Sequence, residues 1–265
     1  MIMKRKLFEG FKDNTPDLRY YAFDWDDNIV YMPTKIMVKN DKGQEMGMST
    51  EDFAKYRSLI GVDDFNYEGE RIVGYAENPF KHFRTEGDKR FIIDAMLAEP
   101  GPSWNDFVEC INNGSIFSII TARGHTPTVI KEAVYNYIVS NTNGINNEEL
   151  TKNLKKYREF MDQENLSKME LINSYLDLCQ FYPVSFGKGS EANPEQEKVK
   201  ALKKFVNYVT NLAHELNKKA YIKNDVKNFF LPFIGFSDDD RKNIEKTSED
   251  EFLSKRVKFK YTGDN

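Results

Sequence analysis

The chain has 265 residues, 40% of them hydrophobic and 14% aromatic, which is enough for one large α/β domain or for a core with an inserted smaller domain. Its formal net charge of −4 argues against non-specific binding to duplex nucleic acid, because such binding needs Lys and Arg to neutralise phosphates. No run is apolar enough for a signal peptide or a membrane span, and two cysteines suggest a reducing compartment. We therefore expect a cytoplasmic protein that does not bind membranes, and the sequence gives no signal for an oligomeric state.

The first informative element is the segment Tyr20–Val30, an apolar run that ends in alternating carboxylates at Asp24 and Asp26. This pattern is typical of a buried strand whose C-terminal end delivers charged side chains into a crevice. An unpaired buried carboxylate costs several kcal/mol, so such a pair needs a compensating interaction. We expect that interaction to be a metal ion, a chemical reaction, or both.

The next stretch combines strand and helix signals. A hairpin is predicted around the turn at residues 40–43, where Asn-Asp-Lys-Gly separates two strand-like runs. Ser49 is expected to cap a helix that runs to about Leu59, and residues 88–97 have a second helical pattern. The Pro-Gly-Pro sequence at 100–102 marks a boundary, so we predict an inserted α+β subdomain at residues 35–102.

A strand without terminal acids follows a predicted helix at 104–112. The run from Ser115 ends in Thr121, and His125 and the residues after it supply a helix start. A hydroxyl and free backbone N–H groups at a strand end, just before a helix, make a site for a phosphate oxygen. Two helices rich in Lys and Glu then form a predicted helical insertion within the core at residues 141–180, and a strand at 181–186 returns the chain to the sheet.

A later helix is predicted to begin with Asn193 as its N-cap and Pro194 as its first residue. After it, the strand-like run from Leu231 becomes acidic at Asp238, Asp239 and Asp240. Parallel strands would bring these carboxylates and those of the first strand to one edge, where like charges about 4 Å apart repel by roughly 4 kcal/mol per pair. Mg2+, before Ca2+, is the cation that suits such oxygen ligands best. The basic run at 255–260 predicts a solvated edge strand, with a basic groove as the alternative.

Taken in chain order, these segments resemble the four motifs of the haloacid dehalogenase (HAD) superfamily of phosphotransferases. The motifs are Asp-x-Asp-x-Asn after a strand, a strand ending in Thr, a later Lys, and a strand ending in Asp-Asp. The resemblance covers roughly residues 19–30, 115–139 and 182–244, and it does not cover 35–104. It implies an α/β fold with a Rossmann-like parallel sheet, helices on both faces, and a cap subdomain at 35–102 inserted between core segments 16–34 and 103–265.

The resemblance also implies a role for each motif residue. Asp24 would be the nucleophile that forms an aspartyl-phosphate, and Asp26 the general acid and base. Thr121, with Ala122 and Arg123, would bind the phosphoryl group or substrate. The Mg2+ ligands would be Asp24, the Asp26 backbone carbonyl, Asp238 as the main distal ligand, and Asp239.

Three points stay open at this stage. The motif lysine is assigned to Lys198, both catalytic and substrate-binding, with Lys188 as the alternative. Asn28 stands where the family usually has Thr, and Asp240 leaves the register of the last motif ambiguous by one residue.

The function that the resemblance implies is hydrolysis of a phosphomonoester, with a phosphorylated small molecule as the substrate. A nucleotide or polynucleotide end phosphatase is the alternative enzyme, so a nucleic-acid end is a possible partner. The alternative from another class is a non-catalytic binding or scaffold protein that keeps the fold, and the intact Asp24 and Asp26 argue against it.

Overall fold

The structure is a computed structural model, and it describes residues 19–160, 166–187, 193–224 and 232–263. Its centre is a five-stranded sheet in which every strand pair is parallel, in the order β11-β10-β1-β8-β9. The strands are β1 (Arg19–Phe23), β8 (Phe117–Thr121), β9 (Gln180–Pro183), β10 (Phe233–Asp238) and β11 (Val257–Tyr261). The predicted parallel α/β sheet is confirmed, and the two acid-bearing strands β1 and β10 are neighbours in it.

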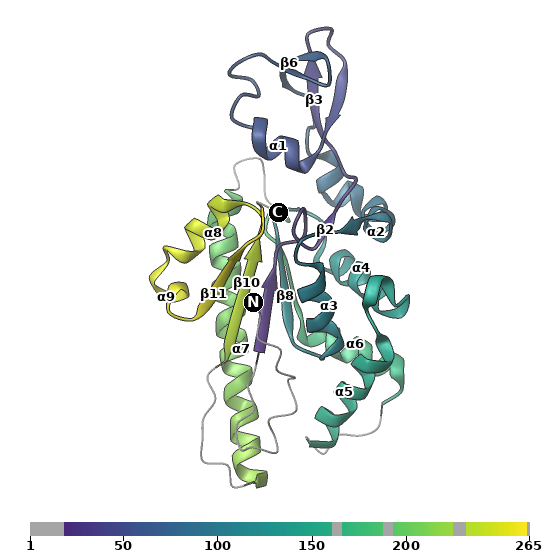
Figure 1. Cartoon of the computed structure of the whole chain (residues 1–265), viewed down its shortest axis with the longest axis vertical. Coiled ribbons are helices and arrows are strands. Elements are labelled where there is room, and N and C mark those ends of the chain that lie inside the picture. The colour runs from purple at the N-terminus through teal and green to yellow at the C-terminus, as the bar shows by residue number, and fades with distance from the viewer. Residues whose placement is uncertain (1–18, 161–165, 188–192, 225–231, 264–265) are drawn as a thin grey trace.

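Helices cover both faces of this sheet (Figure 1). One face carries α3 (Trp104–Asn112), α4 (Pro127–Val139), α5 (Asn147–Phe160) and α6 (Lys168–Leu178). The other carries α7 (Pro194–Asn224), α8 (Arg241–Ser248) and α9 (Glu251–Ser254). The side chains of β8 alternate accordingly, since Phe117 and Ile119 join the first cluster of buried residues and Ile120 joins the second.

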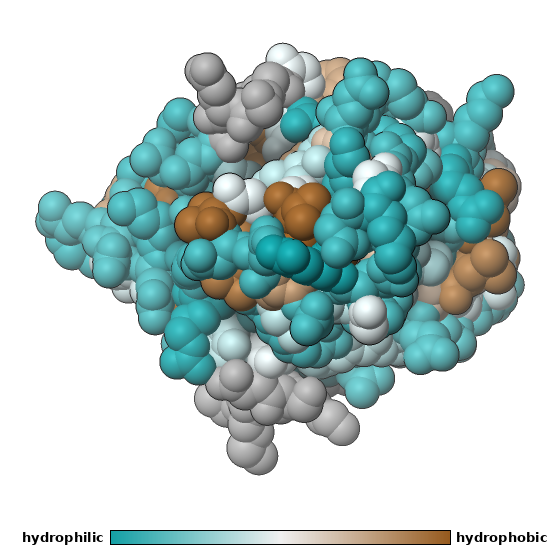
Figure 2. All heavy atoms as spheres, turned by 90° about the horizontal axis from the view of Figure 1, so that it is seen from above, coloured by the Kyte–Doolittle hydropathy of each residue, from teal (hydrophilic) through white to brown (hydrophobic). Residues whose placement is uncertain are grey.

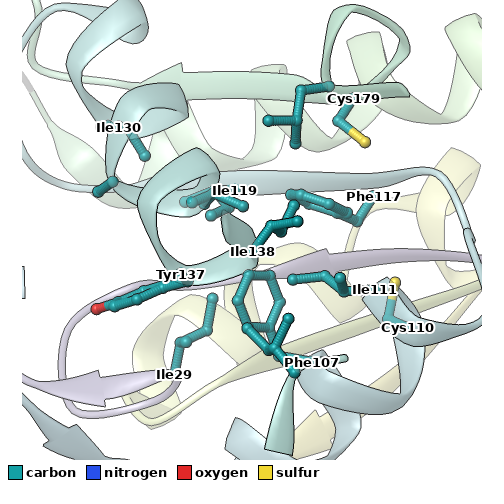
Figure 3. Close-up of a cluster of buried hydrophobic side chains, with 14 of the residues drawn as sticks. Ile29, Phe107, Cys110, Ile111, Phe117, Ile119, Ile130, Tyr137, Ile138 and Cys179 are labelled. Atoms are coloured by element: carbon teal, nitrogen blue, oxygen red, sulfur yellow. The ribbon is translucent and has the colours of Figure 1, made fainter. Parts of the chain in front are cut away.

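The larger cluster holds the first helical layer on the sheet. Figure 3 shows Phe107 and Ile111 of α3 close to Ile138 of α4 and to the strand residues beneath them. Cys110 and Cys179 lie in the same cluster as free, buried thiols. Their burial makes them part of the core, and burial is also the main cause that raises both thiol pKa values.

The chain between β1 and α3 leaves the sheet through a two-stranded ribbon of β2 (Val30–Tyr31) and β7 (Glu99–Pro100). Beyond the ribbon lies an antiparallel sheet in the order β4-β3-β6-β5. Its strands are β3 (Ile36–Asn40), β4 (Glu45–Met48), β5 (Phe65–Tyr67) and β6 (Glu70–Tyr75). Helix α1 (Thr50–Tyr56) lies between β4 and β5 in the chain, and two short 3-10 helices, η2 (Lys81–Phe83) and η3 (Thr85–Gly87), follow β6. We call residues 32–87 the insertion; it lies above the C-terminal ends of the parallel strands in Figure 1, and Figure 2 shows the molecule from that side.

The last helix of the predicted subdomain 35–102 belongs to the main core by its packing. Helix α2 (Asp88–Leu97) buries Phe91 and Ala95 in the same cluster as α4, and the Tyr137 hydroxyl donates a 2.6 Å hydrogen bond to the Ala95 carbonyl. Its apolar residues at spacing i and i+4 form one stripe, and that stripe is buried on α4. Likewise α5 and α6, in the predicted insertion 141–180, pack into this cluster.

Several local predictions are confirmed. Gly43, at φ +80°, ends the Asn40–Gly43 turn, and the Ser49 hydroxyl accepts from the Asp52 N–H at the start of α1. Helix α1 ends at Tyr56, earlier than expected, because the chain turns at 57–63. Strand β11 is an edge strand with Lys258 and Lys260 exposed, which supports the solvated-edge interpretation of the basic run. Within the described ranges, no helix has both the length and the apolar character needed to cross a membrane.

Candidate active site at the C-terminal edge of the parallel sheet

The acidic ends of β1 and β10 meet. The two strands run in parallel register with Phe23 opposite Ser237, and the Asp24 N–H donates a 3.0 Å hydrogen bond to the Ser237 carbonyl. Asp24 comes directly after Phe23 and Asp238 directly after Ser237, so the two aspartates lie side by side at the C-terminal edge of the sheet. One carboxylate oxygen from each of Asp24, Asp238 and Asp239 lies within 4.8 Å of the others. We call these three residues the carboxylate triad.

Lys198 of α7 lies between two members of the triad. Its Nζ is 3.0 Å from Asp24 Oδ1 and 2.8 Å from Asp238 Oδ2, and all three side chains are buried. Although burial favours the neutral amine, the carboxylates of Asp238 and Asp24 raise the pKa of Lys198, so it stays a cation. Lys188, the alternative, lies outside the described residues.

Helix α7 places this lysine because of how the helix begins. The Asn193 side chain accepts a 3.1 Å hydrogen bond from the Gln196 N–H, and Pro194 is the first helical residue, as predicted. One helical turn after Lys198, Leu202 and then Phe205 are fully buried against the sheet. The cap therefore sets where the helix starts, and the apolar stripe sets which way Lys198 points.

The three consecutive aspartates have different surroundings. Both carboxylate oxygens of Asp238 accept hydrogen bonds. Oδ2 accepts from Lys198 at 2.8 Å, and Oδ1 accepts from the Asp240 N–H and from the Asn243 side chain, both at 3.0 Å. Asp240 caps α8 through the Lys242 N–H. Asp239 lines the adjoining cavity, and burial together with the charge of Asp238 raises its pKa to about 7. Asp240 lines the same cavity, and of the two only Asp239 belongs to the carboxylate triad. The leading metal-ligand role expected for Asp238 stays a prediction.

The triad fits a hard divalent cation. Within the described ranges no hydrogen-bond donor satisfies Asp24 Oδ1, although Lys198 Nζ lies 3.0 Å away, and this oxygen is buried. Burial raises the pKa of Asp24 well above its usual range, and Lys198 opposes that rise. Three carboxylates share one ammonium, so further positive charge would stabilise them, and oxygen donors of this kind suit Mg2+.

Asp26 is held outside the triad by Arg123. The guanidinium donates to both carboxylate oxygens, at 2.8 Å from Nε and 2.6 Å from Nη2. The arginine side chain is only 1% exposed, lies 4.5 Å from the centroid of the Phe83 ring, and also donates to the Thr34 hydroxyl. Arg123 also lines the cavity, so its expected role as a substrate contact stays a prediction.

The end of β8 contributes the hydroxyl that was predicted there. Thr121 is fully buried, its Oγ1 accepts a 3.3 Å hydrogen bond from the Arg123 N–H, and Ala122 lines the cavity. His125, four residues after Thr121, contacts Asp88 of α2 at 2.9 Å and Arg123 at 3.2 Å. Burial and Arg123 lower the pKa of His125, so the imidazole is neutral near pH 7.

Asn28, the departure from the family pattern, ties the tips of the strands together. Its Nδ2 donates to the Asp24 carbonyl and to the Ser237 carbonyl, both at 3.1 Å. Its Oδ1 accepts from the hydroxyls of Ser103 and Thr262, both at 2.8 Å. The amide therefore uses both of its ends inside the protein, whereas a threonine hydroxyl has one proton and could not make both donations. Ser103 and Thr262 were not singled out from the sequence, because they lie 75 and 234 residues away and carry no local motif.

A cavity of about 560 Å³ separates the site from the insertion. Asp24, Asp26, Asp239 and Lys198 line its core side, and side chains of the insertion line the other. The insertion contacts the core on both sides of this cavity. Arg57, just after α1, lies 3.3 Å from Asp240 and 3.9 Å from Glu195, and the Gly124 N–H donates a 2.8 Å hydrogen bond to the Phe83 carbonyl.

The site as a whole places Asp24, Asp239, Lys198 and the Asp26–Arg123 pair on one cavity, and the fully buried Asp238 and Thr121 contact Lys198 and Arg123 behind its wall. Comparisons of the chain with protein-family models, with curated proteins and with solved structures gave no match.

Proposed function

We propose that the protein is a Mg2+-dependent phosphomonoester hydrolase of the HAD type. The observation that carries the proposal is the position of Lys198 Nζ, which is 3.0 Å from Asp24 and 2.8 Å from Asp238, with Asp239 beside them facing the cavity. Burying these charges together costs free energy that a purely structural role does not require. Phosphoryl transfer, in contrast, needs a fixed nucleophile and concentrated positive charge at one point.

In the first step, an oxygen of Asp24 would attack phosphorus, and the bond between phosphorus and the leaving oxygen would break. Asp26 would give its proton to that oxygen. In the second step, a water would lose a proton to Asp26 and attack the same phosphorus. This releases inorganic phosphate and restores Asp24, so Asp26 acts as the acid and then as the base.

The surrounding residues would bind and orient the phosphoryl group. The Thr121 hydroxyl would donate to one phosphoryl oxygen, and the charge of Lys198 would stabilise the negative charge that develops on the transferring group. When bound by Asp24 and Asp239, Mg2+ would supply further charge neutralisation at the phosphoryl oxygens. Arg123 would keep the carboxylate of Asp26 in one orientation through both steps.

The insertion would act as a cap. It lies over the site and reaches the core on both sides of the cavity, through Arg57 and through Phe83 and Arg84. A cover of this kind excludes bulk water from the reaction and contacts the leaving group. The contacts through Arg57, Phe83 and Arg84 are an ion pair and hydrogen bonds, so opening for substrate entry would break these polar interactions.

Hydrolysis of p-nitrophenyl phosphate with Mg2+ and with excess EDTA tests the proposal. We expect turnover that depends on Mg2+ and that the Asp24→Asn variant loses, while the far-UV circular dichroism of the variant stays as in the wild type. If neither this ester nor a broad panel of phosphomonoesters is hydrolysed, the protein is the non-catalytic binding alternative. If Asp24→Asn hydrolyses at the wild-type rate, the nucleophile is wrongly assigned.

A further inference from the structure

We infer that the substrate is a mononucleotide-like phosphomonoester, whose leaving group carries a planar aromatic heterocycle that packs on the insertion. This inference rests on the proposed function, because it takes the carboxylate triad as the end of the cavity where the phosphoryl group binds. It concerns the opposite end of the same cavity. That end determines which alcohol can leave.

The insertion side of the cavity is aromatic. Phe53 of α1, Tyr75 at the end of β6, and Phe80 line it. Their rings form a continuous group, with centroid distances of 5.7 Å for Phe53 and Phe80, 6.4 Å for Phe53 and Tyr75, and 6.2 Å for Tyr75 and Phe80. Phe83 continues this group toward Arg123. Planar rings bind well to such surfaces by stacking or edge-to-face contact.

Two of these rings do not serve the core of the insertion. That core is a separate cluster of Val38, Met48, Ile60, Tyr67 and Ile72, against which Phe53 packs. Tyr75 and Phe80 belong to none of the hydrophobic clusters of the described residues, and Tyr75 is 40% exposed. Aromatic surface left open at a cavity beside a charged site is typical of a ligand contact.

The size and charge of the cavity favour a single nucleoside over the end of a polynucleotide. A volume of about 560 Å³ lies in the range of small-molecule sites. Tyr75 and Phe80 also line a second hollow of about 960 Å³, together with Glu77, Asn78, Glu86 and Arg84, whose guanidinium already donates to the Ser185 carbonyl. Those carboxylates would repel a phosphodiester chain that continued past the ring, whereas they can accept hydrogen bonds from amino and hydroxyl groups.

Two substrates that differ only in the ring test the inference directly. Adenosine 5′-monophosphate and ribose 5-phosphate are both primary alkyl phosphates, so the phosphoryl chemistry is the same, and only the first has a base. Stacking of a base on aromatic side chains changes affinity by roughly 5- to 150-fold. We expect kcat/KM in Mg2+ to be at least about tenfold higher for the nucleotide. Equal values for the two substrates would overturn the inference and leave the proposed function standing.

A matched pair of variants locates the contact. Phe80→Leu removes a ring that lines the cavity, and Phe65→Leu removes a ring of the same insertion that stacks on Tyr56 and does not line it. The inference predicts that Phe80→Leu lowers the ratio of the two kcat/KM values at least about fivefold and that Phe65→Leu leaves the ratio unchanged. If Phe80→Leu still prefers the nucleotide by the same ratio of kcat/KM values as the wild type, the base does not pack on Phe80 and this part of the inference is refuted.

Calorimetric titration of the Asp24→Asn variant in Mg2+ decides the question without turnover. We expect adenosine 5′-monophosphate to bind at least about tenfold more tightly than ribose 5-phosphate, and Phe80→Leu to remove most of that difference. If these binding differences are found but the wild-type protein hydrolyses no ester, the proposed function is rejected and the ring site is retained. Tighter binding or faster hydrolysis of a 5′- or 3′-phosphorylated oligonucleotide than of the mononucleotide would overturn the assignment to a single nucleoside.

Discussion

Arg123 donates hydrogen bonds to both carboxylate oxygens of Asp26, at 2.6 and 2.8 Å, from a position that is almost fully buried. The same guanidinium also contacts Thr34, at the start of the insertion, and the ring of Phe83, near its end. Such bidentate pairs fix geometry as well as charge. The orientation of the proposed general acid therefore depends on how the insertion is seated on the core.

This relationship predicts that Arg123→Lys impairs poor leaving groups most. A lysine keeps the charge and loses the two-point contact, so Asp26 would protonate the leaving oxygen less well. General acid catalysis is worth about 10² to 10⁴ in rate, and an alkyl leaving group needs it more than p-nitrophenolate does. We expect kcat/KM to fall at least about tenfold more for an alkyl phosphate than for p-nitrophenyl phosphate.

The control for this prediction is Arg90→Lys, which alters an arginine that is 65% exposed and pairs with Asp94 on α2. It should change neither substrate's kcat/KM. An equal loss for both esters in Arg123→Lys would mean that the pair stabilises the fold and does not position Asp26 for proton transfer.

The different surroundings of Asp238 and Asp239 predict different responses to metal. Asp239 faces the cavity, whereas both oxygens of Asp238 are engaged by protein donors. We expect Asp239→Asn to raise the Mg2+ concentration for half-maximal activity at least about tenfold, and Asp238→Asn to act mainly on kcat through Lys198. Asp250→Asn is the control, because Asp250 caps α9 and does not line the cavity, and asparagine caps a helix as well as aspartate does. The opposite order of the first two variants would restore Asp238 as the main metal ligand.

Much of this site could be predicted from the sequence because the informative patterns are local. Asp24 directly follows β1, Asp238 is the last residue of β10, and Asn193 and Pro194 mark the start of the helix that carries Lys198. Parallel pairing of β1 and β10 then brings these residues together. The apolar periodicity of the strands and the capping residues of the helix can both be recognised in a single sequence.

The remaining features depend on side-chain partners distant in the chain. Nothing near Arg123 in the sequence indicates that it pairs with Asp26, 97 residues earlier. The Asn28 network depends in the same way on Ser103 and Thr262. Helix α2 was predicted as a helix, but the choice between the insertion and the core is made by the surface of α4, which its own pattern does not reveal.

Removal of the buried lysine should destabilise the metal-free protein. Lys198→Met leaves Asp24 and Asp238 buried without their cation, and breaking a buried ion pair in this way costs about 3–5 kcal/mol. We expect urea unfolding in EDTA to show a loss of that size. Lys200→Met, at an exposed position two residues further on, should unfold close to the wild type. Equal stability of the two variants would indicate that the carboxylates do not depend on Lys198 for their charge balance.

The raised pKa of Asp239 predicts a pH dependence of stability without metal. Burial raises its pKa from 3.8 in the unfolded chain to about 7 in the fold, so the folded state binds more protons between these values. The free energy of unfolding therefore falls as pH rises from about 4 to about 7, and it levels off above that range. Urea unfolding in EDTA at pH 5 and pH 8 measures this fall. We expect Asp239→Asn to show a smaller difference between the two pH values, and a difference equal to that of the wild type would contradict the assignment.

The most direct test of the central claim is to locate the phosphoryl group during turnover. Wild-type protein would be mixed with p-nitrophenyl phosphate and Mg2+, quenched in acid within milliseconds, digested, and analysed by mass spectrometry. The account predicts a phosphoryl adduct on the peptide that contains Asp24, and no adduct in Asp24→Asn or in EDTA. Steady hydrolysis by protein that carries no adduct in any quenched sample, or an adduct on a residue other than Asp24, would contradict it.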